Sequence, residues 1–579
     1  MKVISLLGSI TLAALFLTFS ATASATVGPV TTLPDGTQQM TYSIPLENVT
    51  SGQNKIRYRT VNNGTEKPAV DGFITKIVPD LVYTSNGTTP SSSKVMFHHG
   101  VWINVSNGNL FFATGEEKTQ LDMPPGYGYQ YRADHNWMLN EMIHNLTPQP
   151  MDLSVTYRID FIPKTAPAAA AIKPARPIWM DVETSLYPVF DVLRDSGGAD
   201  GEFTYPQDAG DPYGGAKHNE NTIPSDGVLL GTTGHVHTGG LSTDLYLKRA
   251  GAAYGGSICE KPPTYFNKLN RMQRQLNKMS RMQKKAKKKS NQAWMKKLKR
   301  QKKAKSKARR KLKSKAGAAD RAYEACLDTQ PAVEGDRVHL FESVANYFEP
   351  AGPVSWDMAM TSTEDDWRVQ VKAGDTLELQ TTYETERASW YESMGINIVY
   401  WAPNETNGRN PYVTKVDTPG VLNHGHYPEN DDHGGVGGDS AVGPDPTKLP
   451  DGLLSSGPFD IGDYAYEAGN FRLPGAAGRP PVIEKGKSFT FNLTAEDASK
   501  EIWHSLTSCK APCNKSTGIA YPIADGEFQF DSGQLGVGGA PTVNRTTWST
   551  PANLPVGTHT YFCRIHPLMR GAFRVKPKS

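Results

Sequence analysis

A short segment near the end of the chain, YFCRIHPLMRG, holds three metal-binding residue types within seven positions. Cys563, His566 and Met569 follow one another at intervals of three residues between two strand-like stretches. A thiolate, an imidazole and a thioether are ligands that suit copper, and the soft thiolate suits it in both oxidation states. This segment is therefore the first candidate for redox chemistry in the sequence.

The cysteine count points to the same segment. The chain has five cysteines, and an odd number in an oxidising compartment leaves one without a partner. Cys259 and Cys326 flank a basic insertion and could form one bridge, while Cys509 and Cys513 in SCKAPC could form another. Cys563 is left over, and a free thiol outside the cell is a liability unless it is ligated. The alternative is a chance C-x2-H in a turn, with Cys563 in a disulfide.

A second imidazole is available from His504, in KEIWHSLTSC beside an earlier strand. Two histidines and a cysteine in a plane, with a weak axial methionine, form the blue-copper electron-transfer site. With these residues, the region 451–579 resembles the cupredoxins, particularly plastocyanin and amicyanin. The resemblance implies a β-sandwich that transfers single electrons through one type 1 copper, with four ligands: His504, Cys563, His566 and Met569.

More candidate ligands lie upstream, in short segments with strand-like flanks. They are His98 and His99 in VMFHHGVW, His144 in NEMIHNLT, His235 and His237 in TTGHVHTGG, and Met394 in YESMGINIVY. The H-x-H pair would lie on one side of an extended strand, because side chains alternate with a period of two. Taken singly, such residues are more often packing or surface residues, and an H-x-H pair could also hold zinc.

The order of these residues resembles the copper type II ascorbate-dependent monooxygenases, which include the peptidylglycine α-hydroxylating and dopamine β-monooxygenases. This resemblance covers about residues 38–405 and implies two jelly-roll-like β domains with two separated mononuclear coppers. It implies an electron-transfer copper on His98, His99 and His144. It also implies a catalytic, oxygen-binding copper on His235, His237 and Met394. A thioether at the second site favours copper(I), the state that meets dioxygen.

Three positions depart from the peptidylglycine enzymes. The arginine and tyrosine that help hold the substrate carboxylate there are Thr233 and Ile398 here, and an asparagine is Ile396. We therefore do not expect peptidylglycine to be the substrate.

These ligands require β-rich domains to position them. Many Tyr, Thr and Val residues, with 54 Gly and 41 Pro, favour a loop-rich, mainly β protein. In MDLSVTYRIDF every second residue is apolar, from Leu153 to Phe161, which predicts a half-buried strand. Ala and Pro dominate 164–177, which predicts a linker. We expect two jelly-roll-like sandwiches and a cupredoxin sandwich, divided as signal peptide 1–25, domains 26–165 and 166–405, connector 406–450 and domain 451–579.

The first 25 residues are typical of a secretory signal. Lys2 is followed by a mostly apolar run and by Ala23-Ser24-Ala25, the small-x-small form of a cleavage site. The alternative is an uncleaved membrane anchor, although the run is short. We expect a secreted, periplasmic or cell-surface protein without another membrane span.

A basic insertion at 260–325 interrupts the second domain. Its segment 268–315 holds 23 Lys and Arg and no Asp or Glu, and the remaining chain has 39 basic against 58 acidic residues, or about −19. Leu and Met at helical spacing from Leu269 to Met282 predict an amphipathic helix. Its methionine-containing face either packs against other residues or, alternatively, binds copper(I). The insertion is either simply solvated or binds an anionic cell-surface polymer. We do not expect nucleic acid as its partner.

The sequence leaves three functions open. The first is a secreted copper oxidoreductase of the monooxygenase type with a fused type 1 copper domain, which exchanges electrons with a small molecule or redox protein. The second is a non-enzymatic copper-binding electron carrier. The third makes the basic insertion primary, in an adhesin or nucleic-acid binder with incidental copper. His424, His426 and His433 form a further cluster, either a metal site or a solvated loop. The absence of G-x-S-x-G, H-E-x-x-H and P-loop motifs gives hydrolysis little support.

Overall fold

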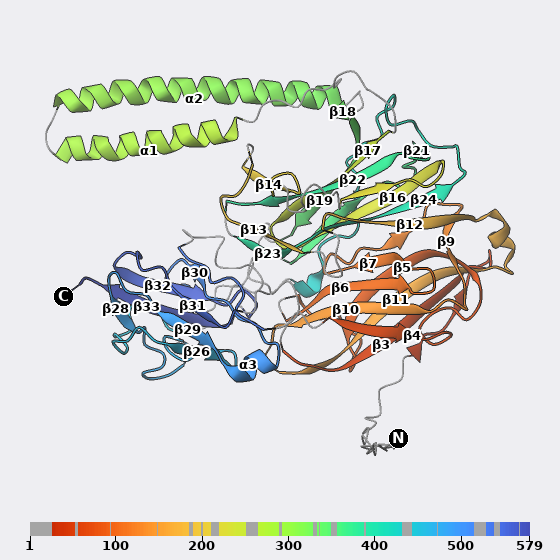
Figure 1. Cartoon of the computed structure of the whole chain (residues 1–579), viewed down its shortest axis with the longest axis horizontal. Helices are drawn as coiled ribbons and strands as arrows, with labels where there is room; N and C mark the ends of the chain where they lie inside the picture. Colours follow the sequence, from red (N-terminus) through yellow and green to blue (C-terminus); the bar gives the residue numbers. More distant parts are fainter. Residues whose placement is uncertain are drawn as a thin grey trace, which may run out of the picture.

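The structure is a computed structural model of the chain that describes most of residues 26–578. The segments outside the description are 1–25, 52–55, 93, 148, 184–188, 199–200, 210–218, 250–264, 289–291, 328–332, 335, 349–355, 387–388, 431–442, 472, 515–528, 538–544, 567 and 579. The expected signal peptide, Cys259 and His433 therefore lie outside the described residues, as does the side chain of Cys326. Within the described part the chain is mainly β and forms several packed sandwiches, as expected from its sequence (Figure 1).

The N-terminal sandwich packs two sheets around one apolar core. One sheet centres on β11 (Met151–Pro163), which pairs antiparallel with β3 (Gln38–Val49) and β5 (Gly72–Tyr83). The alternating apolar residues of β11 are buried, which confirms the predicted strand. The other strands of this sheet are β1 (Thr26–Val27), β2 (Thr31–Thr32), β8 (Leu121–Asp122) and β9 (Tyr127–Tyr131). The opposite sheet has the order β4 (Arg57–Val61), β10 (Trp137–Asn145), β6 (Val95–Asn104) and β7 (Asn109–Thr114).

The middle sandwich also packs two sheets. The first places β24 (Gly395–Pro403) between β12 (Lys173–Asp181) and β16 (Gly227–Val236). Shorter strands extend it: β20 (Met358–Ser362), β21 (Val369–Val371) and β25 (Val421–Leu422). The second sheet comprises β14 (Glu202–Tyr205), β15 (Glu220–Thr222), β17 (Gly240–Lys248), β18 (Val333–Glu334), β19 (Arg337–Tyr347) and β22 (Thr376–Glu384). A separate ribbon pairs β13 (Phe190–Val192) with β23 (Trp390–Ser393).

The segment 164–177 is not the linker that its composition predicts. It contains a 3-10 turn, η1 (Pro167–Ala171), and the start of β12. The first residues of β12 pair in parallel with β9, and its later residues pair with β24 of the middle sandwich. The prediction was wrong because strand pairing with distant residues decided the conformation, and composition does not encode that pairing. β12 therefore joins the two sandwiches through backbone hydrogen bonds.

The basic insertion forms two antiparallel helices, α1 (Phe266–Lys288) and α2 (Gln292–Leu327), which confirms the predicted helix. They project from the middle sandwich as an arm (Figure 1). Leu276 and Leu298 are buried, while many lysines and arginines of α2 are exposed. Among the described residues, no helix has the length and apolar character needed to cross a membrane.

The C-terminal sandwich lies against the other two (Figure 1). One sheet has the order β27 (Ala465–Tyr466), β26 (Phe459–Gly462), β29 (Thr490–Leu493) and β31 (Thr547–Ser549). The other has the order β28 (Val482–Glu484), β33 (Arg570–Lys576), β32 (Gly557–Phe562) and β30 (Thr507–Cys509). Aromatic residues fill the space between them, including Phe491, Tyr561 and Phe573. Remaining short helices are α3 (Ala495–Ser499) here and η2 (Pro428–Asn430) upstream.

Candidate metal centres

The predicted C-terminal ligands come together in the structure. Cys563, His566 and Met569 lie in the loop between β32 and β33, while His504 precedes β30. The antiparallel pairing of β30 with β32 brings His504 to this loop. All four side chains are buried, and Cys563 is not in a disulfide. Cys509 does form a disulfide with a Cα–Cα distance of 6.0 Å to Cys513.

The spacing of these side chains fits a metal ion. Cys563 Sγ lies 3.8 Å from His566 Nδ1, and His566 Nδ1 lies 3.3 Å from His504 Nδ1. Two nitrogens bound to one metal at about 2.0–2.1 Å lie about 3.3 Å apart at a tetrahedral angle. One thiolate and two imidazoles within this spacing form a metal-binding group, and the donor set suits copper. We call His504, Cys563, His566 and Met569 the C-terminal site.

Neighbouring groups orient these ligands and set their protonation states. His504 Nε2 donates to Asp497 Oδ2 at 2.8 Å, which turns Nδ1 toward the other ligands. The backbone amides of Ser505 and His566 each donate to Cys563 Sγ at 3.3 Å. Burial tends to raise the pKa of Cys563, but the His504 contact and these amides hold it below its usual value. Burial likewise tends to lower the pKa of His504, but Asp497 and Cys563 raise it to about 8.

A β-bulge allows His98 and His99 to reach one site from adjacent positions in β6. In the pairing of β6 with β10, His99 is opposite Met142 and Phe97 is opposite Ile143, so His98 is an extra residue. A regular strand sends consecutive side chains to opposite faces, whereas a bulge re-aims one of them. The bulge therefore supplies two imidazoles at one point of the sheet.

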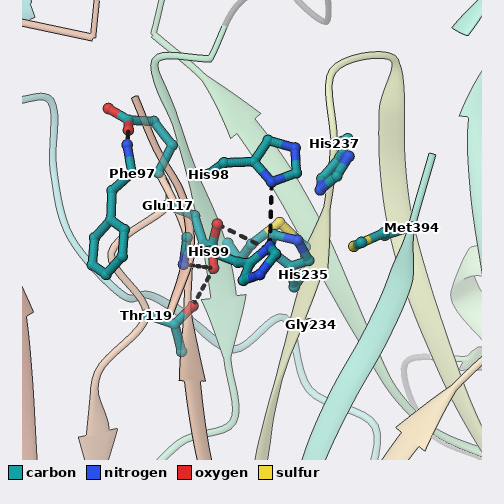
Figure 2. A network of polar contacts seen from close by, with 12 residues as sticks. Phe97, His98, His99, Glu117, Thr119, Gly234, His235, His237 and Met394 are labelled. Atoms are coloured by element: carbon teal, nitrogen blue, oxygen red, sulfur yellow. Dashed lines mark hydrogen bonds and ion pairs between the residues drawn. The ribbon is translucent and has the colours of Figure 1, made fainter. Parts of the chain in front are cut away.

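Five upstream histidines form one continuous group, and His98, His99, His235 and His237 of this group are labelled in Figure 2. The ring centroid of His98 lies 4.5 Å from that of His144 and 4.4 Å from that of His237. His235 and His237 are 5.1 Å apart by the same measure, and the Nδ1 atoms of His98 and His99 are 3.3 Å apart. The resemblance implies two separated sites, but the structure places both histidine sets in contact. We call these five residues the histidine cluster.

Polar partners orient three of these imidazoles. His99 Nε2 donates to Asn140 Oδ1 at 3.2 Å, His237 Nδ1 donates to the Glu392 carbonyl at 2.5 Å, and His235 Nδ1 lies 3.0 Å from Glu117 Oε2. At His235 and His237 these contacts engage Nδ1 and leave Nε2 available to a metal. The Nε2 atoms of His144, His235 and His237 are buried and have no hydrogen-bond partner among the described residues. Buried polar atoms are normally satisfied, so these nitrogens fit the role of metal ligands.

Burial keeps four rings of the cluster neutral, those of His98, His99, His144 and His237. It lowers the pKa of His99 to about 4, against smaller opposing effects of Asn140 and Glu117. Burial and the neighbouring His99 ring lower the pKa of His144 to about 3. The pKa values of His98 and His237 lie well below the usual value for the same reasons, burial first and neighbouring imidazoles second. Neutral imidazoles at pH 7 are the form that binds a metal.

Two cavities adjoin the histidine cluster on different sides. The larger, of about 660 Å³, lies between the N-terminal and middle sandwiches and is lined by His99, His235 and Met394. Met394 extends toward the histidines from the start of β24 (Figure 2). The smaller, of about 80 Å³, has His98, His144 and His237 on one side and Ser505, Arg564 and Ile565 of the C-terminal sandwich on the other. The cluster therefore lies between a ligand-sized cavity and the C-terminal site.

The larger cavity is walled mainly by apolar side chains. Thr233, Ile396 and Ile398, the positions that differ from the peptidylglycine enzymes, all lie in this wall. Asp181 also lines it; its Oδ2 accepts a hydrogen bond from the Trp179 indole at 2.7 Å, and its buried Oδ1 has no partner among the described residues. Burial raises the pKa of Asp181 to about 6, against the Trp179 contact.

Several site residues were not predicted from the sequence. They are Glu117 and Asn140 beside the cluster, Asp497 beside His504, Asp181 in the large cavity, and Trp356, whose ring lies 5.5 Å from His98 and 5.2 Å from His237. Only Asp497 has a local sequence signal, because it follows Thr494 by three residues at a helix start.

The connector residue His426 pairs with Asp357 at 3.0 Å, and His424 packs on Tyr427.

Comparison with solved structures finds several similar chains, and the similarity is limited. The chain is similar to a Cu-containing nitrite reductase (NirK) from Thermus scotoductus SA-01, with 15% sequence identity and a TM-score of 0.14. The similarity covers 36% of this chain and 48% of that chain, so this chain spans about half the length of that reductase. No protein-family model and no curated protein matches the chain. At such a TM-score the likeness carries no argument about function, so the site geometry must carry it.

Proposed function

We propose that this protein is a copper oxidoreductase in which the histidine cluster reacts with dioxygen and the C-terminal site supplies electrons. The observation that carries the proposal is the set of three buried imidazole nitrogens without partners among the described residues, within a histidine cluster beside a large cavity. Copper held there would supply the oxygen-activating redox chemistry. The C-terminal residues resemble a type 1 copper site, and this sandwich adjoins the same cluster.

Within the cluster we assign two ligand sets. His98, His99 and His144 would hold one copper, and His235, His237 and Met394 would hold the copper that meets oxygen and substrate. Ring contacts support this division: the ring centroid of His98 lies 4.5 Å from that of His144 and its Nδ1 lies 3.3 Å from that of His99, while the His235 centroid lies 5.1 Å from that of His237. Each copper would face both cavities, because His99 lines the large one with His235 and Met394, and His237 lines the small one with His98 and His144. The thioether of Met394 favours copper(I). Glu117 and the Glu392 carbonyl orient His235 and His237 through their Nδ1 atoms.

The cavity wall indicates the kind of substrate. Ile396 and Ile398 give it apolar walls, and Thr233 leaves no guanidinium beside the H-x-H motif to hold a carboxylate. Buried apolar lining of this size suits a small, largely apolar molecule. We propose that the unpartnered oxygen of Asp181 accepts a hydrogen bond from such a substrate, since a buried carboxylate oxygen without a partner is costly.

Copper counting combined with turnover tests this function. The metal-free mature chain would be loaded with copper, and oxygen uptake would be measured with ascorbate and a panel of small apolar compounds. About three tightly bound coppers and substrate-dependent oxygen uptake support the oxidoreductase. One blue copper without turnover supports the alternative, a non-enzymatic electron carrier, which the changed positions Thr233 and Ile398 would favour.

We propose that the helical arm is a separate device that holds the protein to an anionic cell-surface polymer outside the cytoplasm. Its support is the concentration of exposed Lys and Arg on α2 in a chain that is otherwise acidic. Removal of residues 266–327 is expected to abolish salt-sensitive binding to such a polymer and to leave copper binding unchanged. Loss of copper-dependent activity in this variant would contradict the separation of roles.

A further inference from the structure

The loop that carries the C-terminal ligands is in direct contact with the middle sandwich. Arg564 lies immediately after the ligand Cys563, and its backbone N–H donates to Ser505 Oγ at 2.9 Å. Ser505 in turn donates its own backbone N–H to the Cys563 thiolate. The position of Arg564 is therefore tied to the geometry of the C-terminal site.

The Arg564 side chain points away from its own site and reaches β23. Its Nη1 donates to the backbone carbonyl of Ser389 at 2.8 Å, just before this strand. The guanidinium centre lies 5.3 Å from the Trp390 ring centroid and 5.5 Å from that of Tyr391. Nη1 also lies 3.2 Å from Asp531 Oδ2, a carboxylate of the C-terminal sandwich. One mostly buried arginine thus joins both sides of the interface by a hydrogen bond, an ion pair and two ring contacts.

The strand that receives Arg564 also positions the histidine cluster. The backbone carbonyl of Glu392 accepts the hydrogen bond from His237 Nδ1. Met394 follows two residues later, with its backbone held by the Tyr383 hydroxyl. The chain from Trp390 to Met394 is therefore a short rigid connection between Arg564 and two proposed copper ligands.

The C-terminal site faces the cluster across the same contact. The small cavity between them is bounded by Arg564 and Ile565 on one side and by His144 on the other.

We propose that Arg564 is the positioning residue that holds the C-terminal site against the histidine cluster, so that electrons pass between them inside one chain. This inference rests on the proposed function for its redox part. One electron would pass from copper at the C-terminal site to copper at the cluster, so the C-terminal site would be oxidised by one electron and the cluster reduced by one electron. An enediol reductant such as ascorbate restores the first. Arg564 touches neither copper and acts by fixing the distance between the two sites.

The first test uses the full-length metal-free protein and hydrogen–deuterium exchange. Arg564→Gln removes the guanidinium group that packs on Trp390 and Tyr391. We expect faster amide exchange in 389–394 and in the loop after β32. Arg574→Gln is the matched control, because Arg574 has the same 13% side-chain exposure and also pairs with a carboxylate, Asp451, but within the C-terminal sandwich. Unchanged exchange of 389–394 in Arg564→Gln, or an equal change in Arg574→Gln, overturns the positioning role.

The second test uses the copper-loaded protein and rapid kinetics. Arg564→Gln is expected to keep its blue absorbance and its rate of reduction by ascorbate. Electron transfer from the C-terminal site to the cluster should slow by roughly a hundredfold, because a small misplacement of reacting groups commonly lowers a rate by that factor. An unchanged transfer rate overturns the proposed route. A cluster that takes up no copper would instead contradict the proposed function, and the exchange measurement would still decide whether Arg564 holds the interface.

Discussion

The C-terminal site and the histidine cluster hold the same kinds of ligand but are built in different ways. Three C-terminal ligands come from one loop between β32 and β33, with His504 added by a neighbouring strand. The cluster draws its imidazoles from β6, β10 and the end of β16, in two sandwiches. A local site needs one intact loop, whereas an assembled site needs two domains in register. The ligand positions of the C-terminal site are therefore set mainly by one loop, whereas those of the histidine cluster are set by the packing of two sandwiches.

The largest expected effect separates the two sites completely. Cys563→Ser is expected to remove all blue absorbance, because the thiolate bond to copper is lost, while the cluster keeps its copper. His237→Ala is the reciprocal variant and should leave the blue absorbance intact while it lowers copper uptake by the cluster. Visible spectra and copper analysis measure both. Loss of both kinds of copper in either single variant would show that the sites are not independent.

The next effect is a loss of oxygen-dependent turnover with no change in the blue absorbance. Met394→Ile is expected to abolish oxygen-dependent turnover, because the proposed thioether ligand is removed from the wall of the large cavity. The blue spectrum of the C-terminal site should not change, since Met394 lies in the middle sandwich. Oxygen uptake and visible absorbance in the same sample test this. Turnover at the parent rate would exclude Met394 as a ligand.

A smaller effect tests the partners around the cluster. Glu117→Gln weakens the contact that orients His235, and we expect copper affinity of the cluster to fall about 10–100-fold. Glu116→Gln is the matched control, because this buried neighbour contacts the Phe97 amide, and burial, opposed chiefly by Lys118, raises its pKa to about 8. Its neutral form at pH 7 is already amide-like, so little change is expected. Competition titration with a copper chelator measures both, and equal effects would remove the special role of Glu117.

The smallest effect is the pH dependence of the metal-free protein, in which His99 and His504 act in opposite directions. His99 has a pKa of about 4, so the unfolded chain binds more protons below pH 6.5, and stability falls as pH drops from 6.5 to 4. His504 has a pKa of about 8, so its contribution is complete below pH 6.5 and is lost as pH rises through 8. The changes are about 3 and 2 kcal/mol at about 1.4 kcal/mol per pKa unit.

Chemical denaturation of the metal-free protein between pH 4 and 9 measures these changes. Asp497→Asn removes the charged partner of His504 and should flatten only the alkaline side of the profile. His99→Gln should reduce the slope of the acid side only, because His98, His144 and His237 keep their lowered pKa values. A profile in which either variant changes the opposite side would contradict the assignment of the two pKa shifts.

The sequence allowed the C-terminal site to be predicted because its ligands are neighbours in one loop. Cys563, His566 and Met569 keep their spacing whatever the rest of the chain does, and the leftover cysteine marked the loop. The main strands and the helical insertion were predictable for a similar reason, since periodicity is local. The assumed linker at 164–177 shows the limit, because pairing with β9 and β24 made part of it a strand.

The arrangement of the histidine cluster could not be predicted from the sequence. The role of His98 depends on a bulge, which is a matter of register between β6 and β10. The contact between His98 and His237 depends on how two sandwiches meet. Glu117 and Arg564 are ordinary charged residues in the sequence, and only the tertiary structure places them beside His235 and against Trp390.

Electron paramagnetic resonance of the metal-free protein during stepwise addition of copper tests the central claim most directly. The account predicts one thiolate-type blue signal together with two nitrogen-rich signals, of which the one from the His235, His237 and Met394 copper disappears in His237→Ala. Saturation at a single copper per chain, or a spectrum that this variant leaves unchanged, would contradict it.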